Sequence, residues 1–285
     1  MTPRHRLMAA AYPIFKLAKA IGRPLGLSDA NSLRVLIYHD IPPEEEAQFA
    51  EQLRWLARSW RFVSPEQFAA LVSGEEPVCG RNLLLTFDDG FASQRRVAQE
   101  VLRPMGIRAM FFAVSDFVSM LDRDEVRRFV AQHIQPGCNV DELPSHLHNM
   151  GWSDLEVLLE LGHSIGAHTR SHARLSRINA EDDLEGEIVA GADTLARRLG
   201  ISIEHFAYTF GDIDSFSRMA LEVARRRFRF VYSGLRGDNA RGVSPFALRR
   251  DAVSTQDSFA LLGAYVEGVA DSYYARARAE LSSWT

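Results

Sequence analysis

The chain has 285 residues, of which 46% are hydrophobic and 25% charged, a composition typical of a soluble protein with one large α/β domain or two small ones. Its net charge of -4 and pI of about 6.2 argue against a general nucleic-acid-binding surface, and we expect no nucleic-acid partner. No window holds 18 consecutive apolar residues, so no ordinary transmembrane helix is predicted. The two cysteines, Cys79 and Cys138, are too few for a disulfide framework and are expected to be free thiols.

Residues 1–32 stand apart from the rest as an amphipathic segment. Pro13 and Lys16 break its short apolar run, which makes a poor signal-peptide core, although "AKA" at 18–20 resembles a cleavage site. A helix that lies on a membrane surface and a helix packed on the protein's own body both fit this pattern. We therefore expect a cytoplasmic protein that can contact the inner membrane peripherally, with a periplasmic location as the alternative. The apolar side chains at helical spacing are Leu7, Met8, Ala11, Ile14, Phe15, Ala18 and Ile21.

Residues 33–285 alternate between short apolar runs and helical patterns, which predicts a single domain with a parallel sheet and right-handed crossovers. About seven such units favour a closed barrel of the TIM type or a variant of it, with an open doubly wound sheet as the alternative. Residues 116–150 break the rhythm and are predicted to form an insertion over one rim. The apolar runs predict strands at 34–39, 82–87, 108–114, 164–169, 204–210, 228–234 and 246–253. The helical patterns lie at 44–59, 64–74, 95–106, 153–162, 180–200 and 215–227, with Ser64 and Ser153 as expected N-caps.

Side chains that can bind a metal or move a proton lie at the ends of three predicted strands. In parallel α/β folds, the carboxyl ends of the strands form the face that carries active sites. Two carboxylates directly after an apolar strand are costly to bury unless a cation or a proton transfer uses them. A solvated surface turn is the ordinary alternative for such a pair. The side chains in question are Asp88, Asp89, His168, His172 and His39.

Two histidines and one aspartate would leave coordination positions open, as in catalytic metal sites. The spacing of His168 and His172 is weak evidence alone, because two solvated histidines in a turn would also satisfy it. With the aspartate pair it predicts a divalent metal that polarises a carbonyl and acidifies a water, and a free aspartate as general base. A protonated His39 would donate to the leaving amine. By itself, His39 would be taken as a buried structural histidine.

Three stretches resemble the signature motifs of a known family. They are "LLLTFDDG" at 83–90, "IGAHTRSH" at 165–172 and "FAYTFGD" at 206–212. They are similar to motifs of the polysaccharide deacetylases, carbohydrate esterase family 4 with its NodB-homology domain, and the similarity runs over about residues 33–254. The resemblance implies a distorted (β/α)7 barrel. It also implies removal of the acetyl group from an N-acetylated sugar, with release of acetate.

The resemblance also assigns roles to single residues. It implies a divalent metal held by Asp89, His168 and His172, usually zinc, with cobalt, nickel, iron and manganese as the other candidates. It implies that Asp88 is the base that activates water. The backbone N–H of Phe210 matches the family's donor to the oxyanion.

The order of the motifs resembles one subgroup of this family. Typical members carry the general-acid histidine in a late motif, but "FALRRDAVSTQ" at 246–256 contains no histidine. The early stretch "VLIYHD" at 35–40 is similar to the circularly rearranged subgroup that includes bacterial deacetylases of poly-N-acetylglucosamine. In that subgroup the acid comes from the first strand, which assigns the role to His39. Asp40 either orients His39 or faces solvent.

Two positions depart from the family pattern. Thr209 stands where the third motif usually has proline, and Ala207 where it often has the arginine that partners the catalytic base. Arg250 is the expected substitute partner of Asp88, with Arg249 as the alternate. The alternative interpretation of Arg249 and Arg250 is two surface arginines at a strand end.

The leading hypothesis is therefore a metal-dependent N-deacetylase of a bacterial surface glycan or its sugar precursor. A second hypothesis keeps the same machinery for another amide, such as a formamido sugar. A third is a catalytically silent glycan-binding protein on the same scaffold, which Thr209 and Ala207 favour and the complete set of chemical groups opposes. The histidines of the insertion, His133, His146 and His148, are taken as loop residues because no strand-end carboxylate pair adjoins them.

Overall fold

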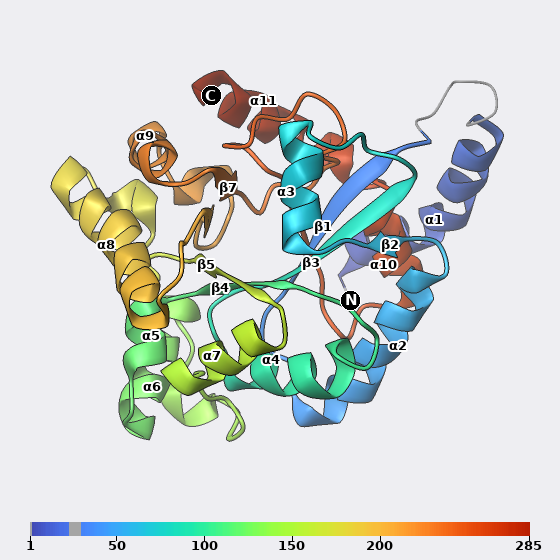
Figure 1. The fold of residues 1–285 in the computed structure, drawn as a ribbon. Helices are drawn as coiled ribbons and strands as arrows, with labels where there is room; N and C mark the ends of the chain where they lie inside the picture. Colours follow the sequence, from blue (N-terminus) through green and yellow to red (C-terminus); the bar gives the residue numbers. More distant parts are fainter. Residues whose placement is uncertain (1, 23–29) are drawn as a thin grey trace.

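The computed structural model describes residues 2–22 and 30–285. These residues form a curled eight-stranded sheet with helices around its outside (Figure 1). The strands are β1 Ser32–Tyr38, β2 Arg61–Phe62, β3 Arg81–Phe87, β4 Met110–Ala113, β5 Ser164–Ala167, β6 His205–Ala207, β7 Phe230–Tyr232 and β8 Asp251–Ala252. The α-helices are α1 Pro3–Gly22, α2 Glu46–Ala57, α3 Pro65–Ser73, α4 Ala92–Val97, α5 Ser115–Ser119, α6 Arg123–Phe129, α7 Trp152–Glu160, α8 Glu181–Leu199, α9 Arg218–Arg227, α10 Phe259–Val266 and α11 Ala275–Trp284.

The strands pair in parallel and the sheet curls into a distorted barrel. Their order is β7-β6-β5-β4-β3-β1-β8, and the short β2, which the sequence did not predict, pairs with β3. One segment joins the two edges, because Leu248 bridges to Tyr232 of β7 while β8 pairs with β1. The expected (β/α)7 barrel is therefore confirmed, and the open doubly wound sheet is excluded. The strand predicted at 246–253 shrinks to β8 because its residues are divided between these two edges.

Side chains alternate between the inside and the outside of the barrel. Val35 and Leu84 belong to the cluster that fills its interior, whereas Leu36 and Leu85, their chain neighbours, pack against the surrounding helices. Both sets are fully buried, so the strands are apolar on both faces, as expected for a covered parallel sheet.

Local signals set the helix boundaries, with one correction. The Ser64 side chain accepts from the N–H of Gln67, whose side chain accepts from the N–H of Ser64, and this capping box starts α3 as predicted. The cap of α7 was predicted wrongly as Ser153. Gly151 occupies the cap position, because the carboxylate of Asp154 accepts its N–H at 2.9 Å and the helix can start two residues earlier than Ser153 would allow.

Residues 116–150 form a separate layer at the rim next to the end of β3. Their helices α5 and α6 and the π-turn Val130–Ile134 pack around a hydrophobic cluster that also includes Phe91 and Val114 of the barrel domain. The backbone ties this layer to the rim, because Met150 donates to the carbonyl of Gly90 at 2.8 Å and Ala92 donates to that of His148 at 2.8 Å. The insertion therefore adjoins the loop that carries the aspartate pair.

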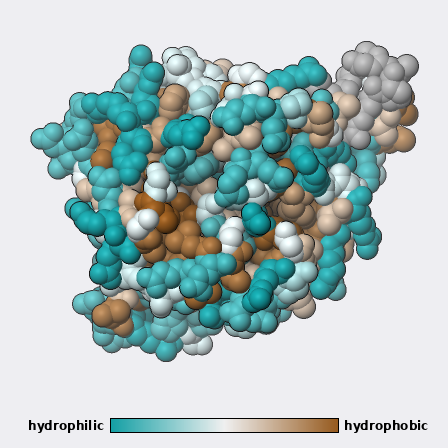
Figure 2. Space-filling model, viewed as in Figure 1, coloured by the Kyte–Doolittle hydropathy of each residue, from teal (hydrophilic) through white to brown (hydrophobic). Residues whose placement is uncertain are grey.

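The amphipathic N-terminal segment forms α1, which packs on α10 at the edge of the molecule (Figure 1). Residues 1 and 23–29 of that segment lie outside the described residues. No helix in the described ranges is both long enough and apolar enough to cross a membrane. The view in Figure 2 shows a mainly hydrophilic surface, with hydrophobic side chains gathered in hollows. The two cysteines are free and exposed.

Candidate active site

The two aspartates leave β3 in different directions. Asp88 continues the inward alternation of Leu84 and Thr86 and points into the barrel mouth. Asp89 has a φ of 78°, a conformation that non-glycine residues adopt rarely, and the following Gly90 has a φ of 102°. These two left-handed residues turn the chain so that both carboxylates reach the rim, where they are 3% and 2% exposed.

Backbone strain is concentrated around this rim. Within the described ranges, four non-glycine residues have a positive φ, and all four lie in the loops that carry the candidate residues. Such conformations persist only where surrounding contacts enforce them, and they cluster at functional sites. They are Asp89, Thr169, His172 and Phe210.

Asp89, His168 and His172 converge as a potential metal-binding group. One ligand atom from each lies within 4.8 Å of the others, and all three residues are buried. The Oδ1 atom of Asp89 is 3.3 Å from Nε2 of His172 and 3.5 Å from Nε2 of His168. Oδ1 is nevertheless a buried acceptor without a hydrogen-bond partner among the described residues. A cation bound by all three residues would satisfy it.

The other ring nitrogen of each histidine is held by a backbone carbonyl. Nδ1 of His168 is 2.8 Å from the oxygen of Ala207, and Nδ1 of His172 is 2.8 Å from the oxygen of His133 in the insertion. A carbonyl only accepts, so Nδ1 carries the proton in each ring, and Nε2 is the atom that can bind a metal. This donor set, two imidazoles and a carboxylate, fits zinc and related divalent ions.

Electrostatics keep the Asp89 carboxylate in the form that binds cations. Burial acts to raise the pKa of Asp89, but the imidazoles of His168 and His172 outweigh it and hold that pKa well below its ordinary value. Burial likewise acts to lower the pKa of His172, and the contact with Asp89 reverses this and raises it. Asp89 therefore presents a charged oxygen to a cation.

Asp88 is held by Arg250. The guanidinium donates to Oδ1 at 2.7 Å and to Oδ2 at 2.9 Å, and a third N–H donates to the carbonyl of Ser233 at 3.1 Å. Arg250 is 1% exposed, so the pair is buried and bidentate. Burial acts to raise the pKa of Asp88, but the charges of Arg250 and His168 outweigh it and hold that pKa below its ordinary value. The alternate candidate, Arg249, donates instead to the carbonyl of Asp238 at 2.8 Å.

His39 borders the same cavity, which has a volume of about 320 Å³ and also exposes Asp88, Asp89 and the two paired histidines. Its side chain is exposed, so His39 is not a buried structural histidine, which was the alternative interpretation.

The two expectations for Asp40 were wrong. Asp40 accepts from the hydroxyl of Ser93 at 2.7 Å and lies 2.9 Å from Nε2 of His146, so it ties the insertion to the end of β1.

The third motif forms the opposite wall. The ring of Phe210 lies edge-on to His172, with centroids 4.8 Å apart, and is 38% exposed. In the described part of the chain, its backbone N–H donates to no other group, so it is available to a ligand. Thr209, in place of the family's proline, donates its hydroxyl to the carbonyl of Ala173 at 2.6 Å and so anchors the loop beside His172.

Two contacts at the site were not predicted. His146 belongs to the insertion, and nothing in the sequence indicates that it would reach Asp40. Glu187 of α8 is buried and accepts from the N–H and the hydroxyl of Ser171, both at 2.9 Å, inside the loop that carries the paired histidines. A Cβ at Gly191, one turn further, would lie 2.8 Å from the backbone of that loop. The sequence does contain a signal that could have predicted a buried role for Glu187, because it is an acidic residue on the apolar face of an amphipathic helix.

Comparison with known proteins agrees with this architecture. Residues 75–226 match the family model of polysaccharide deacetylases. YxkH of Bacillus subtilis (strain 168), named for the same family, is 20% identical over 244 residues, which is 85% of this chain and 74% of YxkH.

Solved structures share the fold. IcaB from Ammonifex degensii has a TM-score of 0.67 and 24% identity, covering 83% of this chain and 97% of IcaB. The Streptococcus pyogenes deacetylase PplD, in complex with acetate, has a TM-score of 0.63 and 20% identity, covering 84% of this chain and 99% of PplD. The de-N-acetylase from Aggregatibacter actinomycetemcomitans has a TM-score of 0.63 and 16% identity, covering 82% of this chain and 100% of the de-N-acetylase chain.

Proposed function

The chain belongs to the polysaccharide deacetylase family, carbohydrate esterase family 4, and we propose that it is a metal-dependent N-deacetylase of N-acetylated sugars in a bacterial surface glycan or its precursor. One observation carries the proposal: the ligand atoms of Asp89, His168 and His172 converge beside the buried pair of Asp88 and Arg250. The names of the structural relatives, which include a de-N-acetylase and a deacetylase solved with acetate, support acetyl as the acyl group that is removed.

Asp89, His168 and His172 would hold the cation, with zinc as the first candidate and cobalt, nickel, iron or manganese as alternatives. A divalent ion supplies polarisation of the amide carbonyl and a lower pKa for water at this position. The buried, otherwise unpaired Oδ1 of Asp89 supports this assignment, because a bound cation would remove the cost of leaving it unpartnered.

The remaining steps are proton transfers and charge stabilisation by this chain's own groups. Asp88 takes a proton from the attacking water, and Arg250 holds its two oxygens in position for that transfer. The backbone N–H of Phe210 donates to the oxygen that becomes negative as water adds to the carbonyl. His39, on the open side of the cavity, gives a proton to the nitrogen of the leaving amino sugar.

The test combines metal analysis with product analysis. The purified protein, a His168→Ala variant and an Asp88→Asn variant are analysed for metal and for acetate release from N-acetylglucosamine oligomers. We expect about one divalent ion per chain in the wild type and in Asp88→Asn, and loss of that ion in His168→Ala. Only the wild type should release acetate.

Three results would contradict parts of the proposal. Unchanged turnover in Asp88→Asn would remove the base assignment. A wild type that binds metal but releases no acetate would direct the search to lipid-linked or formylated sugars. A wild type that binds no divalent ion after reconstitution, and shows no turnover, would leave the silent glycan-binding scaffold as the better account.

A further inference from the structure

Helix α1 is apolar on two opposite sides, and only one of them is covered by protein. On the inner side, Tyr12 packs so closely on α10 that a Cβ at Gly263 would lie 2.4 Å from its ring. Lys19 adds a hydrogen bond of 2.6 Å to the carbonyl of Glu267. These contacts hold α1 against the barrel domain, so its outer side has a fixed orientation.

The outer side of α1 exposes a continuous apolar stripe. Leu7, Ile14, Leu17 and Ile21 are 73%, 74%, 62% and 58% exposed. At about 100° per residue, these four side chains fall within about 80° of the helix circumference, and at about 1.5 Å per residue they extend over about 21 Å. Figure 1 shows α1 at the outer edge of the molecule, and Figure 2 shows hydrophobic side chains at that edge. Stripes of this size on a soluble protein mark interaction surfaces.

The charges on α1 identify the kind of partner. The helix carries Arg4, Arg6, Lys16 and Lys19 and no acidic residue, although the whole chain has a net charge of -4. Lys19 is already paired with Glu267 of the barrel domain, at 3.6 Å. Arg4 and Arg6 lie on either side of the stripe by helical spacing. The guanidinium of Arg4 stacks 3.7 Å from the ring centroid of Tyr273, which is 68% exposed, so a cation and an aromatic ring lie together at one end of α1. Basic residues and aromatic rings beside an apolar stripe are typical of helices at a lipid–water interface.

We propose that α1 docks the protein onto an anionic phospholipid surface, with Leu7, Ile14, Leu17 and Ile21 inserted among the acyl chains and Arg4 and Arg6 at the headgroups. A second copy of the chain is a poorer occupant of this stripe, because two such helices would bring the positive charges of Arg4 and Arg6 together. An uncharged bilayer would accept the stripe but would offer no negative headgroups to Arg4 and Arg6.

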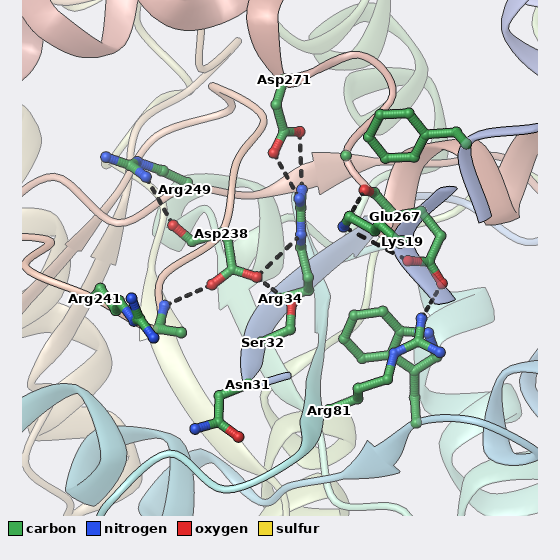
Figure 3. Close-up of a pocket in the computed structure, with 14 residues that line it drawn as sticks. Lys19, Asn31, Ser32, Arg34, Arg81, Asp238, Arg241, Arg249, Glu267 and Asp271 are labelled. Carbon is green, nitrogen blue, oxygen red and sulfur yellow. Dashed lines mark hydrogen bonds and ion pairs between the residues drawn. The ribbon is translucent and has the colours of Figure 1, made fainter. Parts of the chain in front are cut away.

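The position of α1 also leaves the candidate active site open. Phe15 and Lys19 border a cavity of about 390 Å³ that Ser32 and Arg81 line at the amino ends of β1 and β3 (Figure 3). The candidate site lies at the opposite, carboxyl ends of these strands. Docking through α1 therefore sets the barrel wall against the lipid and leaves the mouth with Asp88 beside the membrane, not under it.

The test measures vesicle binding by the whole chain. The protein is sedimented with vesicles of phosphatidylcholine alone and of phosphatidylcholine with phosphatidylglycerol, at low and high salt. We expect binding to the anionic vesicles, weakened by salt, and little binding to the neutral ones. The double variant Ile14→Glu/Leu17→Glu should lower the vesicle partition coefficient about 100-fold or more, because two large side chains no longer enter the apolar layer.

Leu121→Glu is the matched control, since Leu121 is a 98% exposed apolar residue far from α1 in sequence and outside the proposed surface. It should bind vesicles like the wild type, and thermal melting should show that all variants are folded. The proposal is overturned if the wild type does not bind anionic vesicles, or if the double variant binds as well as Leu121→Glu. A dimer that the double variant abolishes, without any vesicle binding by the wild type, would assign the stripe to a second copy instead.

Discussion

The guanidinium of Arg250 contacts both carboxylate oxygens of Asp88, at 2.7 and 2.9 Å, although 162 positions separate the two residues in the chain. Both residues are buried, so each charge has the other as its main partner. The pair fixes the rotation of the Asp88 carboxylate and keeps it ionised, which are the two properties that a general base needs.

Replacing Arg250 with Gln should therefore affect stability and activity together. Removing one partner of a buried ion pair leaves an uncompensated charge and costs about 3–5 kcal/mol of unfolding free energy. The turnover number should fall about 100-fold, because Asp88 loses its orientation and its pKa rises. Arg249→Gln is the control, because the Arg249 guanidinium donates to the carbonyl of Asp238 and not to Asp88, so this change should leave turnover unchanged. Normal turnover in Arg250→Gln would show that the pair is structural only.

The proposed acid role of His39 can be separated from a binding role by the choice of leaving group. His39→Ala should lower turnover of N-acetylglucosamine oligomers about 10²–10⁴-fold, since the amine leaves only after protonation. Hydrolysis of 4-nitrophenyl acetate should change little, because nitrophenolate leaves without a proton. Steady-state kinetics on both substrates provide the measurement. An equal loss on both would exclude the acid role and point to substrate binding or metal-site disruption.

The contact between His146 and Asp40 predicts a role for the insertion in substrate binding. His146→Ala removes the side-chain tie across the rim, and we expect KM to rise about fivefold with little change in kcat, the size expected for a partly buried contact. Limited proteolysis should cut within 116–150 faster than in the wild type. His148→Ala, two positions away in the same loop, should behave like the wild type in both measurements. A fall in kcat without a change in KM would contradict this role.

One buried histidine, His163, and one partly buried histidine, His205, at the other end of the barrel predict loss of stability in acid. Burial lowers the pKa of His163 to about 4 and that of His205 to about 4, from 6.5 in an unfolded chain. Well above pH 6.5 both are neutral in either state. As the pH falls, the unfolded chain binds protons first, so stability is lost progressively between about 6.5 and 4. Near pH 5 the loss should be about 2 kcal/mol for each histidine.

His205→Phe keeps the ring that stacks on Phe230, with centroids 4.8 Å apart, and removes one of these titrations. Denaturant unfolding at several pH values should show a shallower decline of unfolding free energy in this variant than in the wild type. Equal slopes would mean that His205 does not contribute to the pH dependence.

Much of the local structure could be predicted from the sequence, because it depends on residues close together in the chain. Apolar runs and helical spacing predicted the succession of strands and helices, and Ser64 predicted the start of α3. Two predictions failed for different reasons. At the start of α7, Asp154 accepts the N–H of Gly151, so Gly151 and not Ser153 caps the helix. The last predicted strand is shorter than expected because its residues pair with two different edges of the sheet.

The chain by itself determined which chemical groups stand at the strand ends, because Asp88, Asp89 and the paired histidines lie within short motifs whose order is covalent. Only the tertiary structure decided which groups meet. The alternation of side chains across the closed barrel turns Arg250, and not Arg249, toward Asp88. Likewise, the fold of the insertion brings His146 to Asp40, and α10 covers one side of α1 while leaving the other bare. Such contacts join residues far apart in sequence, and their free energy is gained only once the barrel has closed.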